Sequence, residues 1–339
     1  MGFLLRIYVM AFAFLLAGCE TTPKGPLSLQ EQIDHPSTIT LPLINNESGA
    51  LVVKGSLADG ITGRFLIDTG ATLSSIYPDM QRKLGLVPIE RTAIRIHGMI
   101  SSQLQPVAQM PSLTLGQKQL PPFRIAIIPR VAKGAINSTI EPAIHDGIIG
   151  MDILASFHLY IDKPNNVIRL LPLELGPPVM PASWDIVELT RNPFLEDGRQ
   201  LHFFELRLGN GLTPALLDTG AEFNMMNWNT KRFPRLRAAK RKLRKDWEIS
   251  GAIGKFRPII KILSKNARAG QKFWGDDEFL VLDFESLDVL GIDGKPFVIA
   301  GIPMFSEESV MIDFESDRLY FAPDKRRSQD FVTIVKPRK

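Results

Sequence analysis

Two copies of the tetrapeptide Asp-Thr-Gly-Ala, at residues 68–71 and 218–221, carry the residues best suited to do chemistry. Each copy ends an apolar run, in RFLIDTGA and in PALLDTGA. A carboxylate at the end of a buried strand is costly unless it is hydrogen-bonded or paired. If the two copies meet, their carboxyl groups would share one proton. One could then activate a water while the other, protonated, polarises a carbonyl.

The two copies belong to an internal duplication. GIIGMDIL at 147–154 matches VIAGIPMF at 298–305, and LYIDKPNNVIRLLP matches VMIDFESDRLYFAP. Gly150 lies 82 residues after Asp68, and Gly301 lies 83 residues after Asp218. Landmarks in the same order at nearly equal separations indicate a tandem repeat. The proline-rich segment 176–184, GPPVMPASW, separates the halves and reads as the connection between two lobes.

Each Asp-Thr-Gly-Ala follows a predicted β-hairpin. In the first half the turn falls at Asp59-Gly60, and in the second at residues 209–211. Short helix-like stretches come after each copy, PDMQRKLGL in the first half and a longer basic run in the second. We therefore expect a mainly β fold with short helices, whose two lobes pack about a pseudo-two-fold axis. Such packing would bring Asp68 and Asp218 together at the seam.

Six neighbours are expected to support the two turns. They are Thr69, Gly70, Ala71, Thr219, Gly220 and Ala221. The threonines can each donate a hydroxyl across the seam, and the glycines allow the tight backbone that presents amide N–H groups to the carboxylates. The alanines lack the hydroxyl of a serine, which would favour the ionised carboxylate. We therefore predict a pair that keeps its shared proton to milder pH than a serine-bearing relative.

The segment ALLDTGAEFN resembles the active-site segment of retropepsins, and GIIGMDIL resembles the strand that crosses behind the catalytic turn in that fold. The resemblance runs from about residue 40 to residue 324. The chain looks intermediate between retropepsins and pepsin-like enzymes, because it carries two retropepsin-like motifs in one polypeptide. It implies a two-lobed acid-protease β-barrel fold with Asp68 and Asp218 as the catalytic pair. It also implies a polypeptide substrate, no cofactor and no metal. Because one chain carries both halves, a monomer is expected.

Two features of the resemblance are less complete. Pro303 stands where relatives start a helix with a polar residue, so a helix after Gly301 is in question. Flaps closing over the substrate are expected at Gly98 in RIHGMISS, and at Gly251 and Gly254 in EISGAIGKF. The alternative at both places is an ordinary hairpin with a glycine turn.

The N-terminus is expected to hold a signal peptide and a lipid-anchoring site. Residues 1–18 are a basic start and a short apolar run, and Leu16-Ala17-Gly18-Cys19 resembles the lipobox of bacterial lipoproteins. The alternative is a cleaved secretory signal with an incidental cysteine. Cys19 is the only cysteine, so no intrachain disulfide can form. We expect residues 19–38 to be a tether and the protein to be lipid-anchored in the bacterial envelope, facing the periplasm. Glu20 after the cysteine favours the outer membrane.

The remaining chain divides into a first lobe at 39–175, a linker at 176–184, a second lobe at 185–326 and a basic tail at 327–339. The pI of about 9.1 depends on residues 231–245, which hold nine of the 40 Lys and Arg and no acid. Elsewhere the 36 acidic residues outnumber the bases, so no nucleic-acid partner is indicated. The run 231–245 could contact an anionic surface or be a solvated insertion.

Other candidate residues are set aside at this level. The five histidines show no metal-ligand spacing and are expected at loops or on the surface. Asp162 and Asp313 repeat at strand ends, where turn or capping roles are expected, and Asp152 is a candidate for support of the site. Two functions follow: an envelope-anchored aspartic endopeptidase, or an inactive peptide-binding or regulatory lipoprotein of the same fold. Intact Asp-Thr-Gly-Ala in both halves favours the enzyme.

Overall fold

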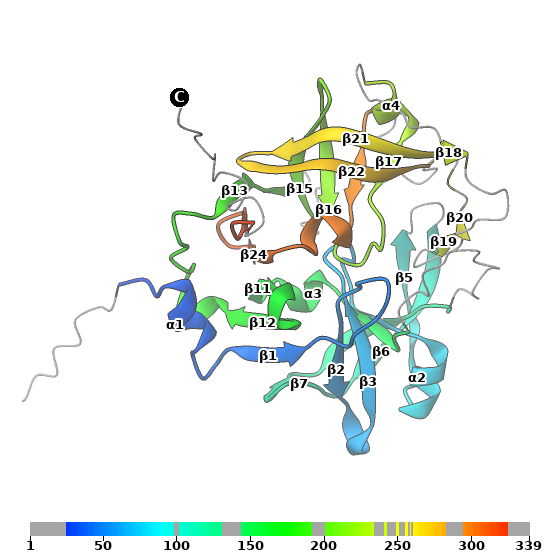
Figure 1. Ribbon diagram of the computed structural model, residues 1–339. Coiled ribbons are helices and arrows are strands. Elements are labelled where there is room, and N and C mark those ends of the chain that lie inside the picture. Colours follow the sequence, from blue (N-terminus) through cyan, green and yellow to red (C-terminus); the bar gives the residue numbers. More distant parts are fainter. Residues whose placement is uncertain are drawn as a thin grey trace, which may run out of the picture.

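The computed structural model describes residues 25–97, 102–130, 144–191, 201–233, 241–242, 249–250, 255–256, 258, 260–282 and 294–324. Strands dominate, and the helices are short, so the expected mainly β fold is confirmed. The described strands form three large sheets and a two-stranded ribbon. In Figure 1 the sheet of the second lobe lies at the top, that of the first lobe at the lower right, and the third sheet at the left.

The first lobe contains a nine-stranded sheet, built on the hairpin that precedes the first Asp-Thr-Gly-Ala. Its strands, in spatial order, are β5 (Pro88–His97), β6 (Ser102–Met110), β9 (Phe123–Ile127), β4 (Ser75–Ile76), β10 (Gly147–Ile149), β3 (Thr62–Ile67), β2 (Val52–Ser56), β7 (Leu113–Leu115) and β8 (Lys118–Leu120). β10 runs parallel to β3 and antiparallel to β4, so it lies directly between the strands that flank the turn.

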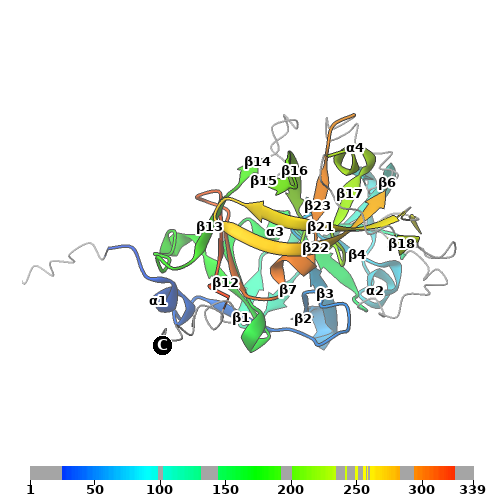
Figure 2. The same ribbon diagram turned by 45° about the horizontal axis from the view of Figure 1, so that its top comes forward.

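The second lobe repeats this plan in an eight-stranded sheet. Its strands, in spatial order, are β14 (Thr190–Arg191), β15 (His202–Leu208), β16 (Gly211–Leu217), β23 (Val298–Ala300), β17 (Met225–Asn227), β22 (Lys272–Leu282), β21 (Ile260–Ala269) and β18 (Arg241–Lys242). Here β23 lies between β16 and β17 with the orientations that β10 has in the first lobe. An added pairing of β15 with β21 curls the sheet towards a barrel, and Figure 2 shows the long hairpin β21–β22 running across this lobe.

The third sheet joins the two halves of the duplication. Its six strands, in spatial order, are β1 (Ile39–Pro42), β12 (Val167–Pro172), β11 (Phe157–Asp162), β24 (Ser309–Asp313), β25 (Arg318–Phe321) and β13 (Asp185–Glu188). The matching hairpins β11–β12 and β24–β25 meet at the centre, where β11 pairs antiparallel with β24. Three strands from each half, related by an antiparallel central pair, give the sheet the expected pseudo-two-fold symmetry.

Alternating apolar residues on these strands build one core that spans both halves. Its largest cluster runs from Ile39 in β1 to Phe321 in β25. Phe65 in β3 and Phe204 in β15, each in a hairpin that precedes an Asp-Thr-Gly-Ala, are almost fully buried in it. Burying such a side chain is worth about 1.5–3 kcal/mol, so the core rather than any polar contact supplies most of the stability. The hairpins of both halves thus pack into the same hydrophobic core.

The described helices are all short. They are α1 (Leu29–Ile33), α2 (Pro78–Lys83), α3 (Met151–Leu154), α4 (Trp228–Lys231), η1 (Ala58–Gly60), η2 (Lys163–Asn165), η3 (Leu173–Leu175) and η5 (Ile302–Phe305). The question raised by Pro303 is answered by η5: the chain still turns there, as a 3₁₀ helix with the proline at an early position that needs no N–H donor. None of the described helices is long and apolar enough to cross a membrane.

The predicted tether is too long. Ser28 caps α1 through a capping box with Glu31, and Leu29 and Gln32 are buried. Leu29 N donates to Val179 O in the linker at 3.1 Å, and Gln32 Nε2 donates to Gly176 O at 2.9 Å. Residues 28–38 therefore belong to the folded body, because the apolar side of α1 packs beside the third sheet. Residues 1–24, which include Cys19, and the tail 327–339 lie outside the described residues.

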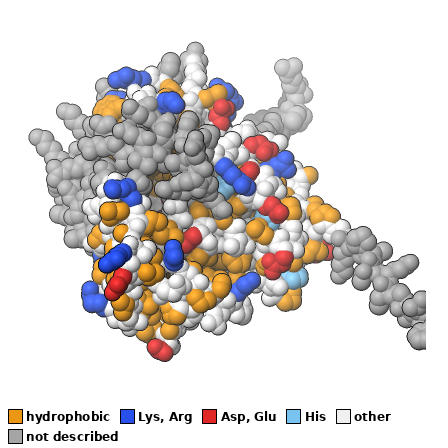
Figure 3. Space-filling view, turned by 180° about the vertical axis from the view of Figure 1, so that it is seen from behind, with side chains coloured by type: hydrophobic (Ala, Val, Ile, Leu, Met, Phe, Trp, Pro, Cys, Tyr) orange, Lys and Arg blue, Asp and Glu red, His pale blue; other side chains and the backbone are white. Residues whose placement is uncertain are grey.

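Most of the basic run also lies outside the described residues. Two of its residues, Arg241–Lys242, form β18 and pair with β21, so at this point the chain is a strand and not a helix. On the face shown in Figure 3, the described Lys and Arg side chains are interspersed with acidic and hydrophobic ones. This distribution agrees with the expectation that basic character is local.

Candidate active site

Each Asp-Thr-Gly-Ala forms a turn at the end of the second strand of its hairpin. Asp68 follows β3, and its Oδ1 accepts hydrogen bonds from Gly70 N at 2.8 Å and Ala71 N at 3.0 Å. Asp218 follows β16, and its Oδ1 accepts from Gly220 N and Ala221 N, both at 3.0 Å. Amide donors aimed at one oxygen fix each carboxyl group while leaving its other oxygen for chemistry.

The threonines bond the two turns to each other. Thr69 Oγ1 donates to Leu217 O at 2.7 Å, and Thr219 Oγ1 donates to Ile67 O at 2.8 Å. Each hydroxyl also accepts the backbone N–H of the other threonine, at 3.1 Å in both directions. Both threonines are 1% exposed, so these four bonds lie in a site closed to water. The arrangement holds the turns at a fixed separation and makes their geometry symmetric.

The glycines present their amide N–H groups to the carboxylates, as expected, and are required for a further reason. Neither Gly70 nor Gly220 has the left-handed backbone that favours glycine. Instead, a Cβ on Gly70 would lie 2.5 Å from Asp218 Cγ, and a Cβ on Gly220 would lie 2.3 Å from Asp68 Cγ. No side chain fits there, because each turn packs directly against the carboxyl group of the other half.

Asp68 and Asp218 therefore face each other across the seam, and each carboxyl group lies against the glycine of the other turn. Burial raises the pKa of Asp68, although hydrogen bonds from Gly70, Asp218 and Ala71 oppose it. Burial and the neighbouring charge of Asp68 raise the pKa of Asp218 well above its ordinary value. The pair as a unit holds one proton to higher pH than isolated aspartates would.

The strands that cross behind the turns come equally close to them. A Cβ on Gly150 would lie 2.8 Å from Ala71 O, and one on Gly301 would lie 2.4 Å from Phe223 O. Met151 N donates to Ala71 O and Ile302 N donates to Ala221 O, both at 2.8 Å. These contacts explain why a glycine precedes each short helix.

Two polar residues that the sequence reading missed lie behind the turns. Ser74 and Asn224 each come six residues after an active-site aspartate and are nearly fully buried. Gly150 N donates to Ser74 Oγ at 3.0 Å, and Gly301 N donates to Asn224 Oδ1 at 2.9 Å. A position-by-position comparison of the repeats could have found them, because both are polar at matching places in apolar surroundings.

Asp152 has the supporting position that was considered for it. Its Oδ1 accepts hydrogen bonds from Ser74 Oγ at 2.7 Å and Ser74 N at 2.9 Å. Burial raises the pKa of Asp152, while the bonds from Ser74 oppose that effect. In the second half, Asn224 Nδ2 donates instead to Asp277 Oδ1 at 3.1 Å.

Apolar residues follow each Asp-Thr-Gly-Ala at matching positions. Leu73 and Ile96 pack on a cluster of the first half that includes Leu66, and Phe223 packs on a cluster of the second half that includes Leu216. Leu73 and Phe223 each lie five residues after an active-site aspartate and remain half-buried. The surroundings of the two turns are thus suited to apolar side chains.

Only part of the predicted flaps can be placed. β5 and β6 form an antiparallel hairpin that pairs up to His97 and Ser102, and β19 (Ile249–Ser250) pairs with β20 (Lys255–Phe256). A hairpin is thus present at both predicted positions. Gly98, Gly251 and Gly254 themselves lie outside the described residues.

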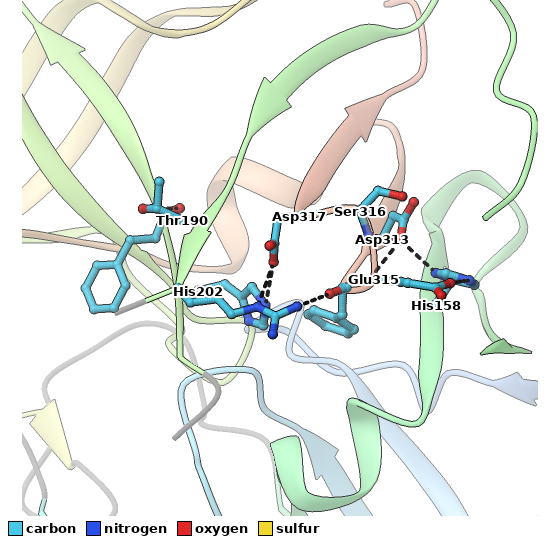
Figure 4. A network of polar contacts seen from close by, with 10 residues as sticks. His158, Thr190, His202, Asp313, Glu315, Ser316 and Asp317 are labelled. Atoms are coloured by element: carbon cyan, nitrogen blue, oxygen red, sulfur yellow. Dashed lines mark hydrogen bonds and ion pairs between the residues drawn. The ribbon is translucent and has the colours of Figure 1, made fainter. Parts of the chain in front are cut away.

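The expectation that the histidines lie at loops or on the surface is wrong for two of them. His158 in β11 and His202 in β15 are 0% and 3% exposed. Figure 4 shows both beside acidic residues of the β24–β25 turn: His158 Nδ1 lies 3.0 Å from Asp313 Oδ1, and His202 Nε2 lies 3.5 Å from Asp317 Oδ1. Pairing with carboxylates is what makes their burial tolerable. The pair His158–Asp313 also joins the two halves, whereas His202 and Asp317 both belong to the second half.

The repeated strand-end aspartates have the expected turn roles and ion pairs besides. Asp313 Oδ1 accepts from Glu315 N and Ser316 N, both at 3.0 Å. Burial would raise the pKa of Asp313, but hydrogen bonds from His158 and Ser316 outweigh burial and lower it. Asp162 accepts from Asn165 in its own turn and from Arg169 Nη1 at 2.7 Å. Both aspartates serve the third sheet, away from the site.

Among the residues that the structure describes, no three His, Cys, Asp or Glu side chains come together as metal ligands would. Of curated proteins, none matches the chain.

One protein-family model matches the first half of the chain. The matched segment contains Asp68, Ser74, Gly150 and Asp152. Residues 53–153 match the model of a family described as aspartyl protease.

Proposed function

We propose that this chain is an aspartic endopeptidase whose single active site is shared by its two halves. The observation that carries the proposal is the pair Asp68–Asp218, half-buried at the seam and fixed by two turns that bond to each other. The family match of residues 53–153 supports the same reading for the first half. The intact second turn argues against an inactive peptide-binding protein.

The proposed reaction uses the shared proton. The ionised carboxylate takes a proton from a water held between the aspartates, while the protonated partner donates its proton to the scissile carbonyl. The water oxygen attacks the carbonyl carbon, and a tetrahedral diol forms. It collapses when the amide nitrogen accepts the proton of one aspartate, the other aspartate takes a proton from a diol hydroxyl as the carbonyl re-forms, and the C–N bond breaks. One acid and one amine leave, and the pair again holds one proton.

The proposed substrate is an extended polypeptide with apolar side chains beside the scissile bond. Leu73 and Phe223, half-buried at matching positions five residues after Asp68 and Asp218, are in keeping with such side chains. β5 is the outer strand of the nine-stranded sheet, where an extended chain could add by backbone pairing.

The proposal includes the location suggested by the N-terminus. Acylation of Cys19 would anchor the protein in the bacterial envelope with its body facing the periplasm, and Glu20 favours the outer membrane. The run 231–245 is a further candidate for contact with an anionic surface.

The test is digestion of an unstructured protein by residues 20–339, purified without the anchor, across pH 3 to 8. Asp68→Asn, Asp218→Asn and a statine-type inhibitor run beside the wild type. We expect cleavage that each substitution and the inhibitor abolish. A folded wild type that cleaves nothing at any pH, yet binds unstructured peptides, would instead support the peptide-binding function.

A further inference from the structure

The two active-site turns rest on residues at equivalent positions. Ser74 O accepts Ala126 N at 3.1 Å in the first half, and Asn224 O accepts Leu280 N at 2.9 Å in the second. The side chains of Ser74 and Asn224 both accept the N–H of the glycine in the crossing strand. These matching bonds define which residues correspond between the halves.

By this correspondence, the supporting carboxylate has changed its place. In the first half it is Asp152, two residues after Gly150. The residue two after Gly301 is Pro303, which offers no acceptor in its side chain. In the second half the carboxylate is Asp277, which lies on β22 three residues before Leu280.

The matching position in the first half holds an apolar residue. Three residues before Ala126 on β9 lies Phe123. At the helix position, the first half has Asp152 and the second half has Pro303. At the strand position, the first half has Phe123 and the second half has Asp277. The turn residue differs in step with them: the Ser74 hydroxyl meets a carboxylate from the helix, whereas the Asn224 amide, with an acceptor and a donor at its end, reaches one on the strand.

We infer that Asp277 is a positioning residue for the turn that carries Asp218, and that it replaces in the second half the carboxylate that Asp152 supplies in the first. The catalytic consequence rests on the proposed function. The bond from Asn224 Nδ2 to Asp277 fixes the amide with its oxygen towards Gly301 N, so Asp277 sets the distance between the crossing strand and the turn.

Removing the Asp277 carboxylate removes the hydrogen-bond acceptor of the Asn224 amide. Asn224 is 2% exposed, so its amide would lose its acceptor in a buried site, which is costly. Ser264 lies directly opposite Asp277 on β21 and is buried. Its hydroxyl makes no hydrogen bond within the described chain, so it does not already serve Asn224. The turn would therefore loosen.

The experiment compares Asp277→Leu, which removes the acceptor, with Asp277→Asn, which keeps an amide oxygen. Asp276→Leu is the matched control, because Asp276 is the exposed neighbour on the same strand. We expect Asp277→Leu to lower kcat about tenfold with KM within about twofold, and the other two variants to stay near wild type. Unchanged kcat in Asp277→Leu would overturn the inference.

A second readout does not depend on catalysis. Amide hydrogen exchange should rise about tenfold in segments 218–224 and 298–303 of Asp277→Leu, and stay unchanged in 68–74 and 147–153. An inactive wild type that shows this pattern would overturn the proposed function and leave the positioning role standing. No change in exchange would overturn the inference, whatever the activity.

If Asp277→Leu does not fold, the inference is tested with a triple variant. It combines Asn224→Ser, Asp277→Leu and Pro303→Asp. It rebuilds in the second half the arrangement of the first. Recovery of folding and of at least half the wild-type kcat supports the inference. A triple variant that is no better than the single one overturns it.

Discussion

The two Asp-Thr-Gly-Ala turns are alike in the amide bonds to the aspartate side chains and different in what lies behind them. The amide donors to Asp68 and Asp218 and the reciprocal threonine bonds match within about 0.2 Å. Behind them, one half uses Ser74 and Asp152, and the other uses Asn224 and Asp277. The comparison teaches that the turn itself is held to one geometry, whereas its support must only supply a buried acceptor at one point.

The largest expected effect comes from adding a methyl group where the halves touch. Gly70→Ala and Gly220→Ala would each place a Cβ within 2.5 Å of the opposite carboxyl carbon. Because the carboxyl groups would have to move apart, we expect kcat/KM to fall by about 10²-fold or more in both variants. Gly25→Ala is the control, since nothing lies within 4 Å of its added Cβ. A variant with wild-type activity would show that the close approach is not needed.

The threonine bonds should matter equally in the two halves. Thr69→Val and Thr219→Val each leave one carbonyl and one N–H of the buried seam without a partner. We expect each to lower the free energy of unfolding by about 1–3 kcal/mol, measured by denaturant titration. Thr40→Val, at an exposed position of β1, should change it by less than about 0.5 kcal/mol. Unequal costs at Thr69 and Thr219 would break the symmetry argued here.

Asp277 should make the second half sensitive to pH. Burial raises the pKa of Asp277 from 3.8 to about 6. The folded state then binds more protons than the unfolded state between these values, so stability falls as pH rises from about 4 to 6. We expect Asp277→Asn to exceed wild type in free energy of unfolding by about 1–3 kcal/mol more at pH 7 than at pH 4. The reason is that asparagine does not ionise as pH rises.

The measurement is the free energy of unfolding of wild type and Asp277→Asn at pH 4 and pH 7. Asp276→Asn, which changes an exposed carboxylate, is the control and should follow wild type. A difference between Asp277→Asn and wild type that is the same at both pH values would contradict the assignment.

The smallest effect is expected at the alanines. In Ala71→Ser or Ala221→Ser, a hydroxyl that donates to the adjacent carboxylate would stabilise its ionised form and lower the pKa of the pair. The pH profile of kcat/KM should then move towards acid, by up to about one unit. A shift towards alkaline pH in both variants would contradict this.

Much of this could be read from the sequence because the chain repeats itself. The repeat located both hairpins, both crossing strands and the pair Asp68–Asp218, since matching segments fold alike. The joint sheet could not be derived in the same way: LYID and VMID mark strand ends, but the pairing of β11 with β24 is a contact between halves. His158 was misplaced for the same reason, because its partner Asp313 comes from the other half.

Asp277 shows a second limit of the repeat. Comparing the halves at Asp152 leads to Pro303, where no carboxylate stands. The substitute comes from β22, at a position whose counterpart is Phe123. Only the hydrogen bonds at Ser74 and Asn224 reveal that the two carboxylates do the same work.

The central claim is that one chain builds the whole site from Asp68 and Asp218. It is tested most directly by assaying Asp68→Asn and Asp218→Asn separately and as an equimolar mixture, with wild type as the positive control. Each variant alone should lose activity by at least about 10²-fold, and the mixture should stay as inactive as its parts. Activity restored by mixing would mean that the site forms between two copies, and activity in either variant alone would mean that the pair does not act as one unit.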